Sequence, residues 1–130
     1  MATLTQRVWR ALRAIPDMAE GSSVFADDDT VRAFYVDGTQ VVNLLDDEIF
    51  EVRVTRKVIS AHRARLKADS RVELRRGTSD WITVRAGSPR DIPFLVELGE
   101  LAAAAHRPPA GVTSRPPPEG AALARRRRFH

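Results

Sequence analysis

Three segments of this chain alternate between apolar and polar side chains, and this pattern limits the fold more than any other feature. Phe50, Val52 and Val54 point away from the intervening Glu51 and Arg53, and residues 71–75 and 81–85 repeat the pattern. Successive side chains of a strand face opposite sides of a sheet. The three segments therefore predict an antiparallel sheet with one face on the core and the other in water.

Helical patterns and turn residues surround these strands. Thr3 and Gln6 have the spacing of a capping box, and Asp37-Gly38 is a hairpin signal. The expected elements are a first helix ending at Pro16, strands near 31–36, 40–45 and 48–54, a helix over 56–68, strands near 71–75 and 81–85, and a last helix from about Asp91 to Ala105. Residues 17–29 are expected to be acidic turns. The order α-β-β-β-α-β-β-α predicts an α+β fold, with a five-stranded antiparallel sheet and helices packed on it.

The composition changes at Arg107. Residues 1–106 carry 13 Arg and 2 Lys against 16 Asp and Glu, whereas residues 107–130 carry 6 Arg and one Glu. The second segment is rich in proline and ends in a basic cluster of Arg125, Arg126, Arg127 and Arg128. Such a composition lacks the apolar residues for a core. We expect an α+β domain over 1–106 and a disordered Pro/Arg-rich tail over 107–130, whose removal leaves thermal stability nearly unchanged.

Composition also argues against several kinds of chemistry. The 130 residues include no cysteine, which excludes disulfides, thiolate metal ligands and thiol nucleophiles. The three histidines, His62, His106 and His130, are too widely spaced for a metal-ligand pattern. We expect no metal and no cofactor. There is neither an apolar run of about 20 residues nor an apolar N-terminal stretch, so we expect no membrane span and a cytoplasmic location.

No catalytic constellation is visible. His62 lies on the apolar face of the helix expected over 56–68, and the sequence places no nucleophile or carboxylate beside it. Phosphate-loop, nucleophile-elbow and zinc-protease motifs are also missing. We therefore expect His62 to be structural, and we predict no catalytic residue.

The polar face of the sheet is the candidate site. Trp81 lies there among arginines, of which Arg53, Arg75 and Arg85 are the principal ones. An aromatic residue among guanidinium groups can bind an anion, a planar ligand or a partner protein. The alternative is a solvated face with cross-strand Arg–Glu pairs and one amphipathic tryptophan.

The last helix is apolar around most of its circumference. Phe94, Leu98 and Leu101 form a stripe nearly opposite to a second one that includes Ile92 and Val96. One stripe packs on the sheet, and an exposed second stripe would mark an interface. Either the first helix or a second copy of the chain covers it. We expect a homodimer through this helix.

Several segments together resemble a known family. They are residues 34–38 (Phe-Tyr-Val-Asp-Gly), 41–43 (Val-Val-Asn), 51–55 (Glu-Val-Arg-Val-Thr), 79–84 (Ser-Asp-Trp-Ile-Thr-Val) and 91–92 (Asp-Ile). Across about residues 20–105 the chain resembles small bacterial luciferase-type domains, whose members are functionally uncharacterised. Members often have histidine in the second strand, where this chain has Asn43. The order of elements is more distantly similar to double-wing domains of the YjbR type and to secretion chaperones.

Together these features favour a non-catalytic binding domain. The polar sheet face around Trp81, Arg53 and Arg85 would bind a small ligand or a partner protein. The alternative is a nucleic-acid-associated domain assisted by the basic tail. Because residues 1–106 have a net charge of −1, we expect only weak duplex DNA binding, which disappears when the four arginines 125–128 are replaced by serine.

Overall fold

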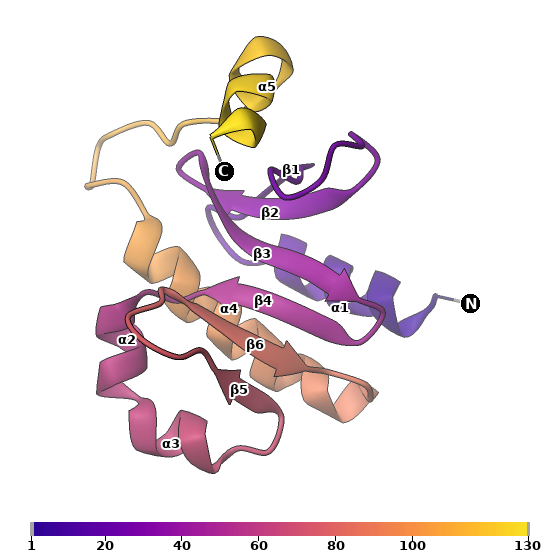
Figure 1. The fold of residues 1–130 in the computed structure, drawn as a ribbon, viewed down its shortest axis with the longest axis vertical. Coiled ribbons are helices and arrows are strands. Elements are labelled where there is room, and N and C mark those ends of the chain that lie inside the picture. Colours follow the sequence, from indigo (N-terminus) through magenta and orange to yellow (C-terminus); the bar gives the residue numbers. More distant parts are fainter. Residues whose placement is uncertain (1, 130) are drawn as a thin grey trace.

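The chain forms an antiparallel sheet with helices packed on it (Figure 1). The computed structural model describes residues 2–129, and within them the sheet has six strands in the order β1-β2-β3-β4-β6-β5. The strands are β1 Ala19–Ser22, β2 Arg32–Val36, β3 Thr39–Asp46, β4 Ile49–Arg53, β5 Val72–Leu74 and β6 Trp81–Arg85. The predicted α+β class and antiparallel sheet are confirmed, with one strand more than expected.

The additional strand is β1, at the edge of the sheet. It lies in the segment that we expected to be acidic turns, and it pairs with β2, placing Ala19 opposite Tyr35 and Ser22 opposite Arg32. The prediction of five strands was wrong because the four residues Ala-Glu-Gly-Ser have no period-two pattern of their own. Their strand conformation comes from pairing with β2, since strand preference depends strongly on context.

The central strands follow the pattern of the sequence. β2 and β3 are joined by Asp37 and Gly38, both with left-handed φ angles of 49° and 74°, as a type I′ hairpin turn requires. Phe50 in β4 and Val84 in β6 lie opposite each other and are buried on the core face. The predicted division into a core face and a polar face is confirmed in these strands.

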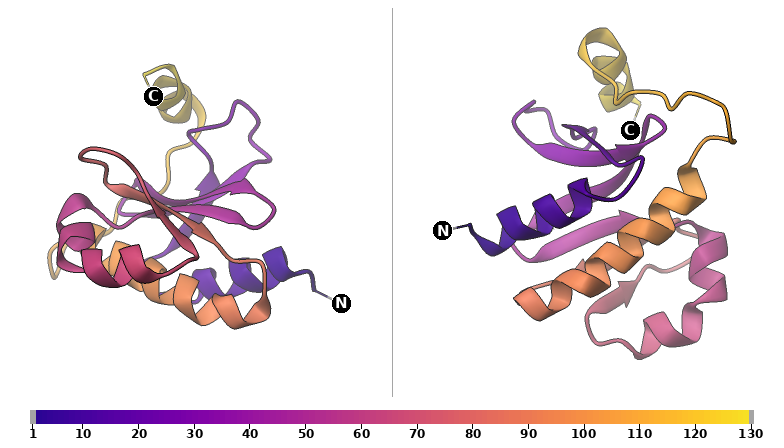
Figure 2. Two further views of the ribbon diagram at one scale, coloured as in Figure 1. Left: turned by 60° about the horizontal axis from the view of Figure 1, so that its bottom comes forward. Right: turned by 180° about the vertical axis from the view of Figure 1, so that it is seen from behind.

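Two helices cover the core face of the sheet side by side (Figure 2). They are α1, Leu4–Arg13, which starts with the predicted capping box of Thr3 and Gln6, and α4, Ile92–His106. The helices come close at Gly99, where an added Cβ would lie 3.1 Å from Cδ2 of Leu12. The first helix thus packs against α4 within the chain.

The apolar stripe of α4 is largely buried inside the chain. Leu98 is 1% exposed and Phe94 is 8% exposed, and the guanidinium of Arg71 lies 4.0 Å above the Phe94 ring. Leu101 is half-buried against the core. The structure of a single chain does not test the homodimer, but these contacts take away the exposed stripe from which we inferred it and favour a monomer.

The helix expected over 56–68 is two helices. They are α2, Arg56–Ala61, and α3, Arg63–Ala68, which meet at His62 with φ of −112° and ψ of 16°. Ile59 is buried from the first and Leu66 from the second. A 3-10 turn, Pro89–Asp91, precedes α4. Within residues 2–129, no helix is long and apolar enough to cross a membrane.

The C-terminal segment packs against the domain, so the expectation of a disordered tail is not supported. Residues Gly120–Arg128 form helix α5, which lies on the opposite side of the sheet from α1 and α4 (Figure 2). Leu123 is 4% exposed, and Pro118 is also buried. The composition of the segment cannot build a core of its own, but its few apolar residues pack on the β1–β2–β3 end of the sheet, as the approach of Pro117 to Gly21 and Tyr35 shows.

Candidate binding site beside Trp81

Trp81 and Arg53 are cross-strand neighbours on the polar face of the sheet. Trp81 opens β6 and Arg53 ends β4, and the register places them directly opposite each other. The Phe25 ring meets the Trp81 ring edge-on, with 5.5 Å between the centroids and an interplanar angle of 70°. Edge-to-face packing fixes both rings and leaves part of the Trp81 surface exposed. The sequence predicted the tryptophan–arginine pair but not Phe25.

Each predicted arginine of this face is paired with a carboxylate. Arg53 Nη2 lies 3.3 Å from Asp80 Oδ2, and Arg85 Nη1 lies 3.8 Å from Glu48 Oε2. Arg75 reaches across the sheet to Glu51. Part of the face therefore has the Arg–carboxylate pairing that we considered as the alternative to a ligand surface.

A pocket of about 350 Å³ lies beside Trp81. Its lining consists of Val24, Phe25, Thr39, Gln40, Arg53, Trp81, Arg126 and Phe129. Of the predicted site residues, Trp81, Arg53 and Arg126 come together here. Arg75 instead borders a smaller hollow on the α2 side of Trp81, and Arg85 borders one beside β5. The predicted sheet surface and the predicted basic tail thus share one pocket.

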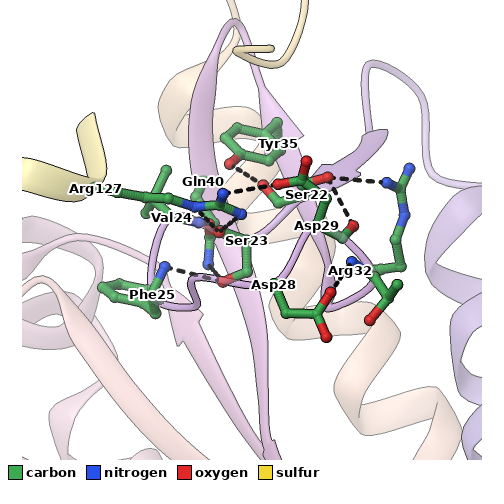
Figure 3. Close-up of polar contacts among 11 residues, drawn as sticks. Ser22, Ser23, Val24, Phe25, Asp28, Asp29, Arg32, Tyr35, Gln40 and Arg127 are labelled. Carbon is green, nitrogen blue, oxygen red and sulfur yellow. Dashed lines mark hydrogen bonds and ion pairs between the residues drawn. The ribbon is translucent and has the colours of Figure 1, made fainter. Parts of the chain in front are cut away.

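The tail arginines are divided between the domain and solvent. Arg127 donates to the Ser23 carbonyl oxygen at 3.1 Å and to Asp29 Oδ1 at 2.7 Å, and Figure 3 shows its side chain reaching into this turn. Arg126 donates to the Gly38 carbonyl oxygen. Arg125 and Arg128 are exposed. Two of the four arginines of the basic cluster therefore contact the domain, and two face solvent.

A buried polar network supports the floor of the pocket. Among residues 2–129, the buried polar side chains are Ser23, Gln40 and Asn43. The Ser23 hydroxyl donates to Asn43 Oδ1 at 3.3 Å and accepts from the backbone N–H of Phe25 at 3.1 Å. Gln40 Oε1 accepts from the backbone N–H of Val24 at 2.8 Å (Figure 3). These bonds hold the 23–25 segment, and with it Phe25, in place.

The hydroxyl groups of Ser23 and Tyr35 have hydrogen-bond partners that hold them in place but do not make them nucleophilic. The Ser23 proton is directed to an amide oxygen, and an amide is no base for a nucleophilic hydroxyl. The Tyr35 hydroxyl donates to the Ser22 carbonyl oxygen at 2.6 Å, and burial raises its pKa, so it stays a neutral donor. His62 lies at the α2–α3 junction and does not line the pocket.

The electrostatics of the pocket favour an anion. Its lining contains two arginines and no Asp or Glu among the described residues. Asp80 partly neutralises Arg53, whereas Arg126 donates to a neutral carbonyl oxygen and forms no ion pair within residues 2–129. Arg53 Nε is buried and has no hydrogen-bond partner in the same range. The pocket therefore carries positive charge beside the three aromatic rings of Phe25, Trp81 and Phe129.

The backbone between β4 and α2 is strained next to this site. Thr55 has φ of 88°, which is rare for a β-branched residue. Its N–H donates to the Asp80 carbonyl oxygen at 3.0 Å, and Asp80 Oδ1 accepts from the Arg56 N–H at 2.9 Å. Asp80 therefore holds this turn while it also pairs with Arg53. The double role makes Asp80 a positioning residue for the pocket wall.

Comparison with known proteins adds no relative: no family model, curated protein or solved structure matches this chain. The resemblance to luciferase-type domains, and the more distant one to double-wing domains, therefore stay predictions.

Proposed function

We propose that this protein is a non-catalytic binding domain whose polar sheet face binds a small planar organic anion in the pocket beside Trp81. The observation that carries the proposal is the convergence of Trp81, Phe25, Arg53 and Arg126 around one hollow. Its volume of about 350 Å³ is in the range of small-molecule sites. A flat solvated face would have favoured a partner protein instead.

The two kinds of lining residue divide the work of recognition. The aromatic rings offer a flat apolar wall to a planar body, and stacking on such a wall tolerates many ring systems. Arg53 and Arg126 offer hydrogen-bond donors to a carboxylate or a similar anionic group, and charge-assisted bonds to guanidinium are among the stronger polar contacts.

A titration with 2-naphthoate tests this function, with uncharged 2-naphthamide as the matched compound. We expect the indole N–H signal of Trp81 in a nitrogen–proton correlation spectrum to shift with 2-naphthoate and much less with 2-naphthamide. Arg53→Gln should weaken binding by roughly tenfold, the usual effect of losing a hydrogen bond to a charged group.

Arg85→Gln is the matched control. Arg85 is also a sheet arginine with a carboxylate partner, but it lies outside the pocket. Its substitution should leave the affinity for 2-naphthoate unchanged. Equal weakening by both substitutions, or equal binding of the two compounds, would contradict the proposed site.

A further inference from the structure

A second and larger groove lies on the other side of the sheet, beneath α1. It has a volume of about 620 Å³ and extends from one face of α1 to the start of β2 and to Leu44 of β3. Its apolar floor is formed by Trp9, Val31 and Leu44, and its rim by Arg10, Arg13 and Arg32. Arg10 and Arg13 are exposed, whereas Trp9 is half-buried.

The apolar floor is rigid because Trp9 is attached to the core. Its ring packs on the ring of Phe34, a fully buried residue of β2, with 4.5 Å between the centroids. Val31 is 38% exposed, and Leu44 is half-buried. Together these side chains leave a fixed apolar surface open to solvent.

The rim carries more positive charge than the chain neutralises. Arg13 and Arg32 share one carboxylate, Glu20, at 2.9 Å and 3.6 Å. Partial burial raises the pKa of Glu20, but the hydrogen bond and charge of Arg13, with Trp9 and Arg32, bring it below its ordinary value. Arg10 forms no ion pair with any residue in the range 2–129, and no Asp or Glu in that range lines the groove.

We propose that this groove binds a small amphiphilic anion: a carboxylate or similar acidic head at Arg10 and Arg32, with an alkyl body lying on Trp9, Val31 and Leu44. Charge selects the head, because a groove with three arginines disfavours cations. Apolar area selects the body, because transfer of methylene groups from water onto this floor is favourable. The proposal is independent of the site beside Trp81, since Trp9 packs on the core face of the sheet and Trp81 lies on the polar face.

Octanoate, well below its micelle-forming concentration, is the probe for this groove, and octanol and octylammonium are the matched compounds. The whole chain is titrated while the indole N–H signals of Trp9 and Trp81 are followed separately. We expect octanoate to shift the Trp9 signal with saturation, and octanol and octylammonium to bind at least fivefold more weakly. Equal binding of octanol, or no shift of the Trp9 signal, would overturn the proposal.

Two arginines of α1 provide matched variants. Arg10→Gln removes a groove residue that has no partner in the described chain, whereas Arg7→Gln removes an exposed arginine of the same helix that does not line the groove. We expect Arg10→Gln to weaken octanoate binding by roughly fivefold, as suits an exposed charge pair, and Arg7→Gln to leave it unchanged. Equal loss in both variants would show nonspecific attraction and overturn the proposal. Binding to phosphatidylglycerol vesicles without binding of octanoate would also overturn it, in favour of a membrane surface.

Discussion

Gly21 and Pro117 are 96 positions apart in the sequence, and their contact is the sharpest test of how the tail is placed. A Cβ added at Gly21 would lie 2.7 Å from the Cβ of Pro117 and 3.1 Å from Cε1 of Tyr35. The first distance is too short for two carbon atoms, so Gly21→Ala must displace Pro117. We therefore expect Gly21→Ala to release the tail from β1.

The size of the effect is bounded from two sides. Forcing a methyl group into a packed contact costs about 1–3 kcal/mol. The tail can avoid the cost by local undocking, so the global stability falls by no more than the docking free energy of the tail. Without the tail, the strand preference for alanine over glycine, roughly 0.5–1 kcal/mol, is opposed only by the close contact with Cε1 of Tyr35 at 3.1 Å. The same substitution should thus destabilise the docked state and favour the undocked one.

Limited proteolysis with trypsin measures undocking directly, because α5 contains four consecutive arginines, 125–128. Gly21→Ala should accelerate cleavage in α5 by about tenfold or more, as a loss of 1.4 kcal/mol or more in docking implies. Pro117→Gly removes the clashing Cβ. The double variant Gly21→Ala/Pro117→Gly should therefore be cleaved no faster than Pro117→Gly alone, a non-additive result expected of residues in contact.

Unchanged cleavage in Gly21→Ala would show that Pro117 does not lie on Gly21, and the described docking of the tail would be refuted. If the effects of the two substitutions on the cleavage rate simply added, the new methyl group would act through its contact with Tyr35 and not through Pro117. Leu123→Ala serves as a positive control, because it shortens the side chain that α5 buries without touching Gly21.

Three further predictions follow from the same contacts. The backbone N–H of Arg115, and then its side chain, lower the pKa of Asp37, so this contact stabilises docking above the ordinary aspartate pKa and is lost as the pH falls through the lowered value. Asp37→Asn should reduce the acid-induced undocking of the tail, followed by the amide signals of α5 in a nitrogen–proton correlation spectrum. Sedimentation equilibrium should show a monomer at high micromolar concentration that Leu101→Glu does not change, because Phe94 and Leu98 are buried within the chain. A dimer that dissociates on this substitution would instead support the homodimer predicted from the sequence. Fluorescence anisotropy should show weak duplex DNA binding that is lost with serine at 125–128 and strengthened by Gly21→Ala, because Arg126 and Arg127 are engaged in the docked tail; a steep salt dependence retained by the serine variant would favour a nucleic-acid site on the domain.

The sequence predicted correctly those elements whose structure depends on residues that are close together in the chain. The capping box of Thr3 and Gln6 and the Asp37-Gly38 turn were predicted because each depends on neighbouring residues alone. The alternation in β4 and β6 was predicted because burial of one sheet face repeats at every second residue. The same local signal placed Trp81 and Arg53 on one face.

Features that depend on distant partners were not predicted. β1 exists because β2 is beside it, and α5 contacts the sheet through Leu123 and arginines that bond carbonyl oxygens of Ser23 and Gly38. Every residue has a backbone carbonyl, so the sequence does not show which carbonyl oxygens accept hydrogen bonds from the tail. Gly21 was the one available signal, since a glycine within a strand often marks the close approach of another segment.

The uneven charge of the chain acquires an intramolecular explanation. The sequence contrasts a domain of net charge −1 with a basic tail, and this contrast suggested an external polyanion. In the structure Arg115 pairs with Asp37 and Arg127 with Asp29, so acidic turns of the domain already neutralise part of the tail. A phosphate backbone must compete with these carboxylates, and the apparent affinity is reduced by the fraction of chains whose tail is docked. Arg126 adds a second coupling, because it lines the pocket beside Trp81. An anion bound there would interact with the docked tail and stabilise it, so we expect the proposed ligand binding at Trp81 and nucleic-acid binding by the tail to oppose each other.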